Sequence, residues 1–292
     1  MEKAENWRDY ELIDCSTGEK LERFGKYKFI RPDPQIIWKT ERVSDWDFDA
    51  RYIRSEKGGG RWDFKSPAAK ERQTIRYNSP CGELRFIVKP TDFKHMGIFP
   101  EQAVNWDRVQ KLISERFAGR NGEANILNLF AYTGGATIAA AKAGARVCHV
   151  DAAKGMVSWA RENAAESGLS GAPIRYITDD CTKFVGREIR RGVRYDGIIM
   201  DPPSYGRGPG GELWKLEDNL FDMVELTAKL LSDKPLFFML NSYTTGLSAE
   251  VMEYLLRTVL PKMNVTSYTL GLPVKDSLNA LPCGSTAIAI ES

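Results

Sequence analysis

The sequence predicts an α/β protein with a doubly wound, mainly parallel sheet and a small β-rich domain at its N-terminus. First, a short apolar run at 125–130 breaks at the pair Gly134 and Gly135 and resumes as an Ala-rich segment, a pattern typical of strand, turn and helix. Second, strand-like and helix-like segments then alternate to about residue 260, as they do in parallel sheets covered by helices. Third, residues 10–90 contain short aromatic and β-branched runs separated by Gly and Pro.

The alternating part is expected to form a seven-stranded sheet. A helix with apolar residues at helical spacing is expected at 104–117, before the first strand. The elements expected after that strand are helix 136–143, strand 144–151, helix 153–167, strand 174–178, helix 181–190, strand 195–200, helix 216–231, strand 236–240 and helix 248–260. Two further strands, 265–270 and 285–290, follow without an intervening helix. They predict a terminal hairpin that places one antiparallel strand in the sheet.

Residues 1–90 are expected to form a separate antiparallel unit, and residues 91–292 the α/β domain. A chain of 292 residues is long enough for two domains on the usual scale of about 100–200 residues each. The strands expected in the first unit are 26–30, 35–38, 61–64 and 83–88.

A basic segment at 51–76 lies within the first unit, where eight Lys/Arg and three acids alternate with aromatic residues. Basic side chains beside aromatics suit a phosphate backbone with unstacked bases. Arg54, Lys57 and Arg61 are therefore candidate RNA contacts. A solvated hairpin face with its aromatics turned into the core fits the same pattern equally well.

Composition excludes several classes of protein. The balance of 41 Lys+Arg against 39 Asp+Glu means that any attraction to nucleic acid must be local. No apolar run approaches the roughly 20 residues of a membrane span, and the acidic start lacks a signal core, so we expect no membrane association and a cytoplasmic location. Five widely spaced cysteines without C-x-x-C, and only two histidines, argue against structural disulfides and a metal site.

Ligands of open α/β sheets bind beyond the carboxyl ends of the strands, so the residues directly after each strand are site candidates. The glycines of the first turn would let the backbone approach a ligand, and the helix start near Gly135 offers free N–H groups. Asp151 ends the second strand, about 20 residues further on, where it can accept hydrogen bonds from both ribose hydroxyls. Asp180, after the third strand, can accept one from an adenine amino group. Together they predict an adenosine-shaped slot, and the absence of G-x-G-x-x-G and of a Walker loop argues against a pyrophosphate cofactor.

The stretch Asp201-Pro-Pro-Ser-Tyr205 follows the fourth strand. Two prolines fix the backbone and remove two N–H donors. Carbonyls and the Asp201 carboxylate are left to accept hydrogen bonds from an amine, while Tyr205 offers a stacking face. The stretch predicts a site for a planar, amino-bearing base, and the alternative is that the prolines merely end a strand.

A glycine-rich loop at 206–215 comes directly afterwards. It could order over a substrate, with Arg207 and Lys215 near phosphate and Trp214 packing on a base or on the protein. A plain mobile connector is equally compatible with its composition.

These residues together resemble the class I S-adenosylmethionine-dependent methyltransferases, which have a Rossmann-like fold. The resemblance rests on Asn128-Leu-Phe-Ala-Tyr-Thr-Gly-Gly135, Asp151, Asp180 and Asp201-Pro-Pro-Ser-Tyr-Gly-Arg-Gly208, and covers roughly residue 93 to the C-terminus. Within the family it is most similar to bacterial large-subunit ribosomal RNA methyltransferases that modify cytosine C5 or guanine N7. The resemblance implies S-adenosylmethionine as cofactor and RNA, ribosomal RNA in particular, as partner.

The resemblance also implies roles for individual residues. Residues 128–135 would hold the methionine part of the cofactor, Asp151 the ribose, and Asp180 with the Cys181 backbone the adenine. The preceding loop would cover the cofactor. The full set of implied cofactor residues is Phe99, Gln102, Asn128, Phe130, Tyr132, Thr133, Gly134, Gly135, Asp151, Asp180 and Cys181.

One departure from that family concerns the reaction. Its cytosine-C5 enzymes use a cysteine after the fifth strand as nucleophile, whereas this chain has Asn241-Ser-Tyr-Thr-Thr-Gly. We therefore expect a single displacement onto a base nitrogen, with Asp201, Pro202, Pro203 and Tyr205 as the catalytic residues. Three alternatives stay open: C5 methylation through Cys283 or another nucleophile, an NAD-dependent oxidoreductase, and a non-catalytic RNA-binding protein.

Overall fold

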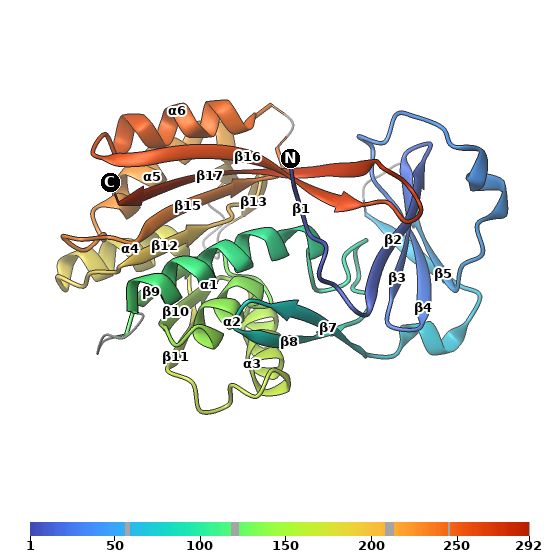
Figure 1. Cartoon of the computed structure of the whole chain (residues 1–292), viewed down its shortest axis with the longest axis horizontal. Helices are drawn as coiled ribbons and strands as arrows, with labels where there is room; N and C mark the ends of the chain where they lie inside the picture. Colours follow the sequence, from blue (N-terminus) through green and yellow to red (C-terminus); the bar gives the residue numbers. More distant parts are fainter. Residues whose placement is uncertain (56–58, 118–122, 208–212, 245, 292) are drawn as a thin grey trace.

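The larger part of the molecule is built on one eight-stranded sheet, in the order β1-β16-β17-β15-β12-β9-β10-β11 (Figure 1). The computed structural model describes residues 1–55, 59–117, 123–207, 213–244 and 246–291. The strands of the sheet are β1 (Glu2–Lys3), β9 (Asn125–Leu129), β10 (Arg146–Asp151), β11 (Ile174–Thr178), β12 (Gly197–Met200), β15 (Phe237–Ser242), β16 (Met263–Pro273) and β17 (Ala280–Glu291).

Helices cover both faces of this sheet (Figure 1). Helices α1, α2 and α3 contact one another in sequence on one side, and α4, α5 and α6 do so on the other. Because its central strands are covered on both faces, they are largely buried, and β12 is apolar and buried throughout. The helices are α1 (Ala103–Phe117), α2 (Gly135–Lys142), α3 (Lys154–Glu166), α4 (Cys181–Arg190), α5 (Leu216–Ala228) and α6 (Ala249–Val259).

The predicted fold class is confirmed, with one strand more than expected. Strand β17 runs antiparallel between β15 and β16, as the terminal hairpin predicted. The additional strand is β1, which pairs in parallel with β16 through Glu2 opposite Leu270. Only two exposed residues long, β1 carries no periodic pattern from which it could have been predicted.

The N-terminal residues form a five-stranded sheet and a separate hairpin. The five strands are β2 (Tyr10–Ser16), β3 (Glu19–Phe24), β4 (Tyr27–Pro32), β5 (Ala50–Arg54) and β6 (Gly60–Phe64), and β4 and β5 pair in parallel. The hairpin consists of β7 (Gln73–Ser79) and β8 (Gly82–Val88). It lies on α3, where the Asn163 Oδ1 accepts a hydrogen bond from the Ile87 N–H at 2.8 Å. The expected single antiparallel unit is therefore two sheets, one of them mixed.

The strand expected at 35–38 is wrong. The chain turns after Pro34, so the Ile36 N–H donates to the Asp33 carbonyl, and the Ile36 carbonyl accepts from Gly18. These bonds hold the segment against the β2–β3 turn instead of in a ladder. Short 3-10 helices complete the described chain at η1 (Glu41–Asp45), η2 (Pro67–Lys70) and η3 (Pro100–Gln102), with a small hairpin of β13 (Tyr205–Arg207) and β14 (Leu213–Lys215).

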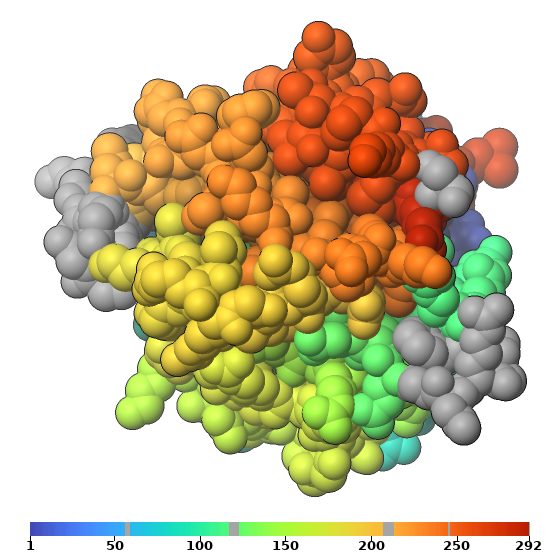
Figure 2. Space-filling view, turned by 90° about the vertical axis from the view of Figure 1, so that its left-hand side faces the viewer, coloured from blue at the N-terminus to red at the C-terminus, as the bar shows by residue number. Residues whose placement is uncertain are grey.

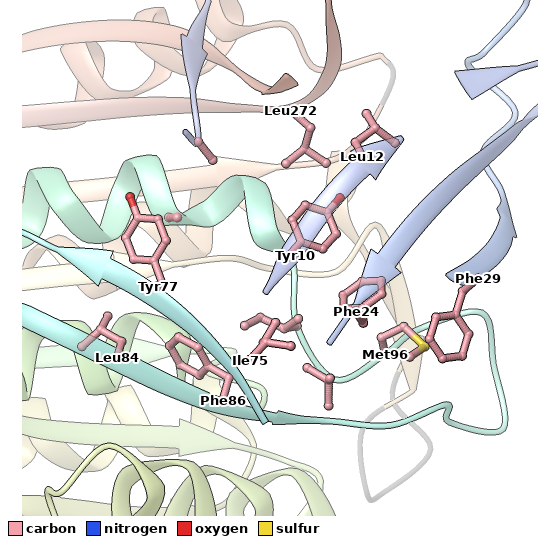
Figure 3. Close-up of a cluster of buried hydrophobic side chains, with 14 of the residues drawn as sticks. Tyr10, Leu12, Phe24, Phe29, Ile75, Tyr77, Leu84, Phe86, Met96 and Leu272 are labelled. Carbon is pink, nitrogen blue, oxygen red and sulfur yellow. The ribbon is translucent and has the colours of Figure 1, made fainter. Parts of the chain in front are cut away.

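One apolar cluster joins the N-terminal strands to the large sheet (Figure 3). Tyr10 and Phe24 from the five-stranded sheet belong to the same buried cluster as Met96 and as Leu272 of β16. The Trp7 Nε1 also donates to the Pro100 carbonyl at 3.0 Å. The domain boundary at residue 90 stays a prediction, but the core is continuous across it.

The five-stranded sheet lies at one end of the molecule (Figure 1). Seen from the opposite end, the surface is formed by green to red segments, and blue segments show only at the edge (Figure 2). In the described ranges no helix has the length and apolarity to cross a membrane.

Candidate functional site

Two adjoining cavities lie at the carboxyl ends of β9, β10, β11, β12 and β15, and we refer to them together as the strand-end pocket. The larger, of about 390 Å³, is lined by residues that include Asp151, Asp180 and Asp201. The smaller, of about 60 Å³, reaches Asn128 and Gly135. Phe99, Phe130, Tyr132 and Asp201 line both cavities. The structure thus brings together the loop before α1 and the ends of all four strands that the sequence singled out.

The β9–α2 turn has an unusual backbone. Phe130 and Tyr132 have φ values of 56° and 50°, in the left-handed region that side chains rarely adopt. Asp151 stabilises the turn, because its Oδ2 accepts the Tyr132 N–H and its Oδ1 the Ala153 N–H, both at 2.8 Å. Burial raises the pKa of Asp151. Each carboxylate oxygen retains a second lone pair that can accept a hydroxyl.

The two glycines of the turn are required by packing. A Cβ on Gly134 would lie 2.9 Å from the Ala160 Cβ, and Gly134 also has a φ of 88°. A Cβ on Gly135 would lie 2.5 Å from the Trp106 ring. The glycines thus admit the close approach of α3 and α1, and their expected contact with a ligand stays a prediction. Beside them the Thr133 Oγ1 donates to the Gly97 carbonyl at 2.5 Å, which fastens the loop before α1 to the turn.

Asn128 and Asp180, the residue that caps the N-terminus of α4, are both hydrogen-bonded within the protein. The Asn128 Nδ2 donates to the Thr137 Oγ1 at 2.9 Å, and that hydroxyl contacts the Nδ1 of the buried His149 at 2.9 Å. Asp180 caps α4, where its Oδ1 accepts the Lys183 N–H at 2.8 Å. The buried Cys181 sulfur accepts the Phe130 N–H at 3.4 Å. Both Asp180 and Cys181 line the larger cavity.

Asp201 is held by a residue after the fifth strand. Its Oδ1 accepts a hydrogen bond from the Asn241 Nδ2 at 2.8 Å, and the Asn241 Oδ1 accepts one from the Thr286 hydroxyl at 2.9 Å. Burial raises the pKa of Asp201 to about 6. Pro202 and Pro203 line the larger cavity beside it, and the Pro203 carbonyl accepts the Trp214 Nε1–H at 2.6 Å.

A hydrogen-bonded chain runs from Asn241 to the loop before α1. Asn105 donates to Thr286 at 3.0 Å and to the Gln102 Oε1 at 2.7 Å, and the Gln102 Nε2 donates to the Tyr243 hydroxyl at 2.9 Å. Phe99 completes the wall, with its ring 5.4 Å from that of Tyr243 and 5.6 Å from that of Tyr132.

Sequence reasoning missed Asn241, Tyr243 and Asn105 as site residues. Asn241 and Tyr243 follow the fifth strand, so the rule that selected Asp201 would have found them. Asn105 had no such signal, because it reaches its partner Thr286 across 181 residues of sequence.

The hairpin after Asp201 is turned differently from the prediction. Tyr205 is 59% exposed and is not among the residues that line the strand-end pocket. Trp214 packs on the protein, with its ring 5.6 Å from that of Phe130. Lys215 forms an ion pair with Asp218 at 3.5 Å. Arg207 pairs with Leu213 through its backbone, and its side chain lies outside what the structure describes.

The basic segment at 51–76 has its aromatics in the core. Tyr52 is buried and contacts the half-buried Trp62 edge-on at 5.4 Å, so neither ring is free to stack on a base. Arg54 and Arg61 are exposed. Lys57 lies outside the described residues. Within those residues, no cluster of His, Cys, Asp and Glu could hold a metal ion.

Comparisons with known proteins agree with this geometry. The family profile "S-adenosylmethionine-dependent methyltransferase" matches residues 81–219. Two proteins called ribosomal RNA large subunit methyltransferase K/L are 33% identical to the chain: one from Shewanella frigidimarina over 51% of this chain and 20% of its own length, and one from Alteromonas mediterranea over 62% and 23%. The chain therefore spans less than a quarter of these curated relatives.

Solved structures extend the similarity over the whole chain. The SAM-dependent methyltransferase from Agrobacterium tumefaciens has a TM-score of 0.89 and 35% identity, over 99% of this chain and 93% of that one. The protein SMU.776 complexed with SAH has a TM-score of 0.73 and 18% identity, over 98% and 76%. The second likeness is one of fold alone.

Proposed function

Because the chain belongs to the S-adenosylmethionine-dependent methyltransferases, we propose that it methylates a base of RNA, ribosomal RNA in particular, on a nitrogen atom in a single displacement. Membership in the family establishes S-adenosylmethionine as the cofactor and methyl transfer as the activity. It replaces the NAD-dependent oxidoreductase as an alternative, whereas a non-catalytic RNA-binding protein that retains the methyltransferase fold is distinguished by the labelled-methyl experiment below.

The polar groups of the strand-end pocket fit the parts of S-adenosylmethionine. Asp151 has lone pairs for the ribose hydroxyls, and Asp180 can accept the adenine amino group. The Asn128 Oδ1 can accept the ammonium of the methionine part, because only its Nδ2 is engaged with Thr137. When bound, S-adenosylmethionine supplies a methyl group on an activated leaving group, so the protein mainly has to align the acceptor nitrogen.

The observation that supports nitrogen as the target is the hydrogen bond from Asn241 to Asp201. The stretch that begins at Asn241 follows the fifth strand, where C5 enzymes of the resembling group have their cysteine. The Asn241 amide leaves the second carboxylate oxygen of Asp201 to a ligand. Above a pH of about 6 Asp201 is an anion. It then accepts a hydrogen bond from a base amine and directs the nitrogen lone pair toward the methyl group, together with the Pro202 carbonyl.

RNA as the substrate is supported by the names of the curated relatives and by two exposed cations. The relatives are ribosomal RNA methyltransferases, although the chain spans only about a fifth of their length. Arg54 and Arg61 are exposed, and no carboxylate lies within ion-pair distance of either in the part of the chain that the structure describes. Phosphate is the anion that such cations bind in RNA. The cytoplasmic location expected from the sequence remains part of this proposal.

Transfer of labelled methyl to purified ribosomal RNA, followed by nucleoside mass spectrometry, tests the proposal. We expect one N-methylated base, and at least about thirtyfold slower formation of it by Asp201→Ala at equal cofactor occupancy. Label in 5-methylcytidine would refute nitrogen as the target, and the absence of any label in RNA would refute the substrate.

C5 methylation through Cys283 is a second candidate, because this half-buried thiol lies next to Gly284, which packs against the Tyr243 ring. Burial and the Glu101 carboxyl raise the pKa of Cys283 well above its ordinary value, which disfavours the thiolate that such a nucleophile needs.

A further inference from the structure

A separate pocket of about 350 Å³ lies between the five-stranded sheet and the loop before α1, and we call it the interface pocket. Its polar lining comes from three regions: Lys20 and Arg54 of the N-terminal sheet, Lys94 and Glu101 of the loop, and Cys283 of β17. It shares His95, Phe99 and Tyr243 with the strand-end pocket. The two pockets are therefore neighbours across an aromatic wall.

Two cations of the interface pocket, Lys94 and Arg54, have no ion-pair partner among the described residues. The Lys94 Nζ donates to the Pro32 carbonyl at 3.1 Å, and the described residues place no carboxylate within ion-pair distance of it. Burial lowers the pKa of this half-buried lysine to about 8, against the opposing influence of Asp33. Arg54 is exposed, and the described residues place no carboxylate within ion-pair distance of it. The neighbouring Arg31 shows the contrast, because its Nε and Nη2 both bond to Glu22 at 2.7 Å. Partly desolvated cations without counter-ions are typical of sites that bind an anion.

Acidic and aromatic groups restrict what that anion can be. Glu101 is 4% exposed, and burial raises its pKa against the opposing influence of Lys20. Asp33 also lines the pocket, 3.6 Å from the Lys20 Nζ. Two carboxyl groups beside the cations disfavour a ligand with several phosphates, but they can accept the hydroxyl or amine hydrogens of a ligand with one. Phe99 and the partly exposed Tyr243 offer ring faces.

We propose that the interface pocket binds the phosphate of one nucleoside monophosphate unit on Arg54 and Lys94, and that the base of this unit passes the Phe99–Tyr243 wall to reach Asp201 in the strand-end pocket. Resting on the function proposed above, this unit is the nucleotide whose base is methylated, since enzymes that modify a base take it out of the stack into a pocket. A nucleotide unit of an RNA strand and a free nucleoside monophosphate carry the same phosphate, ribose and base. The experiment therefore has to distinguish these two sources.

The test is calorimetric titration of the full-length protein, saturated with S-adenosylhomocysteine, with each of the four nucleoside 5′-monophosphates and the four matching nucleosides. We expect one monophosphate to bind at least about tenfold more tightly than its nucleoside, the usual scale for charge-assisted contacts to phosphate. Arg54→Ala and Lys94→Ala should each remove most of that difference and leave cofactor affinity unchanged. Lys39→Ala is the matched control, an exposed lysine of the N-terminal part outside the interface pocket. Competition by a ribosomal RNA fragment indicates the strand as the source, and monophosphate binding without competition indicates a free nucleotide.

Arg54→Ala keeps the test valid if Lys94→Ala misfolds through loss of the Pro32 bond, because no bond within the described chain depends on the Arg54 side chain. The proposal is overturned if no monophosphate binds more tightly than its nucleoside, or if Arg54→Ala binds like the parent. If Arg54→Ala loses nucleotide binding but the parent transfers no methyl group to RNA, the proposed binding site is supported and the proposed RNA methylation is refuted. If the parent methylates RNA but Arg54→Ala binds the nucleotide as the parent does, the RNA methylation is supported and the proposed binding site is refuted.

Discussion

The strand-end pocket and the interface pocket share the Phe99–Tyr243 wall but prepare their polar groups in opposite ways. In the strand-end pocket, Asp151 accepts two backbone N–H groups and Asp201 accepts the Asn241 amide before any ligand binds. In the interface pocket, no carboxylate of the described residues lies within ion-pair distance of Lys94 or Arg54. Groups that are already hydrogen-bonded within the protein are fixed in orientation, which suits the alignment of reacting atoms in a transition state. Cations without an ion-pair partner can instead bind an anionic group of a ligand. Changes in the first pocket should therefore affect chemistry and cofactor binding, and changes in the second should affect substrate binding.

The largest effect is expected from Asp201→Ala. Loss of one preorganised partner of the acceptor nitrogen should remove about 2–4 kcal/mol of transition-state stabilisation. Methyl transfer should fall by roughly 30- to 1000-fold in kcat/KM, while calorimetry shows little change in cofactor affinity. If Asp201→Ala methylates at the parental rate, other residues align the acceptor nitrogen, and the two pockets do not differ in the way argued above.

Asp151→Ala should weaken S-adenosylmethionine binding by about 1–3 kcal/mol, because two ligand hydroxyls lose their acceptor. The substitution also frees the N–H groups of Tyr132 and Ala153, so the cavity loses part of its preorganisation. Calorimetry measures the affinity, and Asp233→Ala, an exposed acid away from both pockets, serves as control. Thermal unfolding should show that both variants fold. Unchanged affinity would remove Asp151 from the cofactor site.

The strand-end pocket was largely predictable from the sequence, and the interface pocket was not. Asp151 ends the largely buried β10, Asp201 follows the buried β12, and Asp180 comes shortly after the partly exposed edge strand β11. Parallel strands bring their carboxyl ends to one edge, so short-range pattern was enough. The interface pocket joins Lys20, Lys94 and Cys283, which are far apart in sequence and lie on elements without a common rule. Only the packing of β16 and β17 against the N-terminal sheet brings them together, and no local pattern encodes that packing.

The N-terminal part shows the same limit. Short aromatic and β-branched runs separated by Gly and Pro located β4, β6 and β8. The parallel pairing of β4 with β5 depends on a long connection that such runs do not constrain. The sequence of the basic segment was compatible both with RNA contacts and with a solvated face whose aromatic residues are turned into the core. Burial of Tyr52 and the hydrogen bond from the Trp62 Nε1 to the Thr91 carbonyl at 2.9 Å argue against base stacking on these two rings, and phosphate binding by the basic side chains stays a prediction.

The pH dependence should report Asp201. Burial raises its pKa to about 6 in the folded protein, and the anion is the form that accepts the amine. The value of kcat/KM should therefore be at its plateau above that pH and fall as the pH is lowered through about 6, toward roughly a tenth one unit below. Asp201→Asn, which is never charged, should lose this acidic limb. A limb of the same midpoint in Asp201→Asn would assign the titration to another group.

A smaller effect is expected when Arg54, Lys57 and Arg61 are all replaced by Ala. If these side chains bind phosphate, RNA affinity should fall and its dependence on salt should flatten, by about 0.7 in log–log slope for each phosphate of a single strand that is no longer neutralised. Filter binding of a ribosomal RNA fragment at several salt concentrations measures the slope. The triple variant should retain cofactor affinity. Parental affinity and slope would show that this surface is merely solvated.

The smallest effect is expected from Cys283→Ser. Cys283 lines the interface pocket and not the strand-end pocket, and its raised pKa keeps it a thiol, so nitrogen methylation should proceed at the parental rate. RNA containing 5-fluorocytidine makes the test direct, because a cysteine that adds to C6 is trapped as a covalent protein–RNA adduct after methyl transfer. Displacement onto a nitrogen leaves no adduct, since no bond forms between protein and base. Denaturing electrophoresis should show none for the parent. An adduct that disappears in Cys283→Ser would mean that the thiol reaches the base across the Tyr243 wall, and that the interface pocket takes part in the chemistry itself.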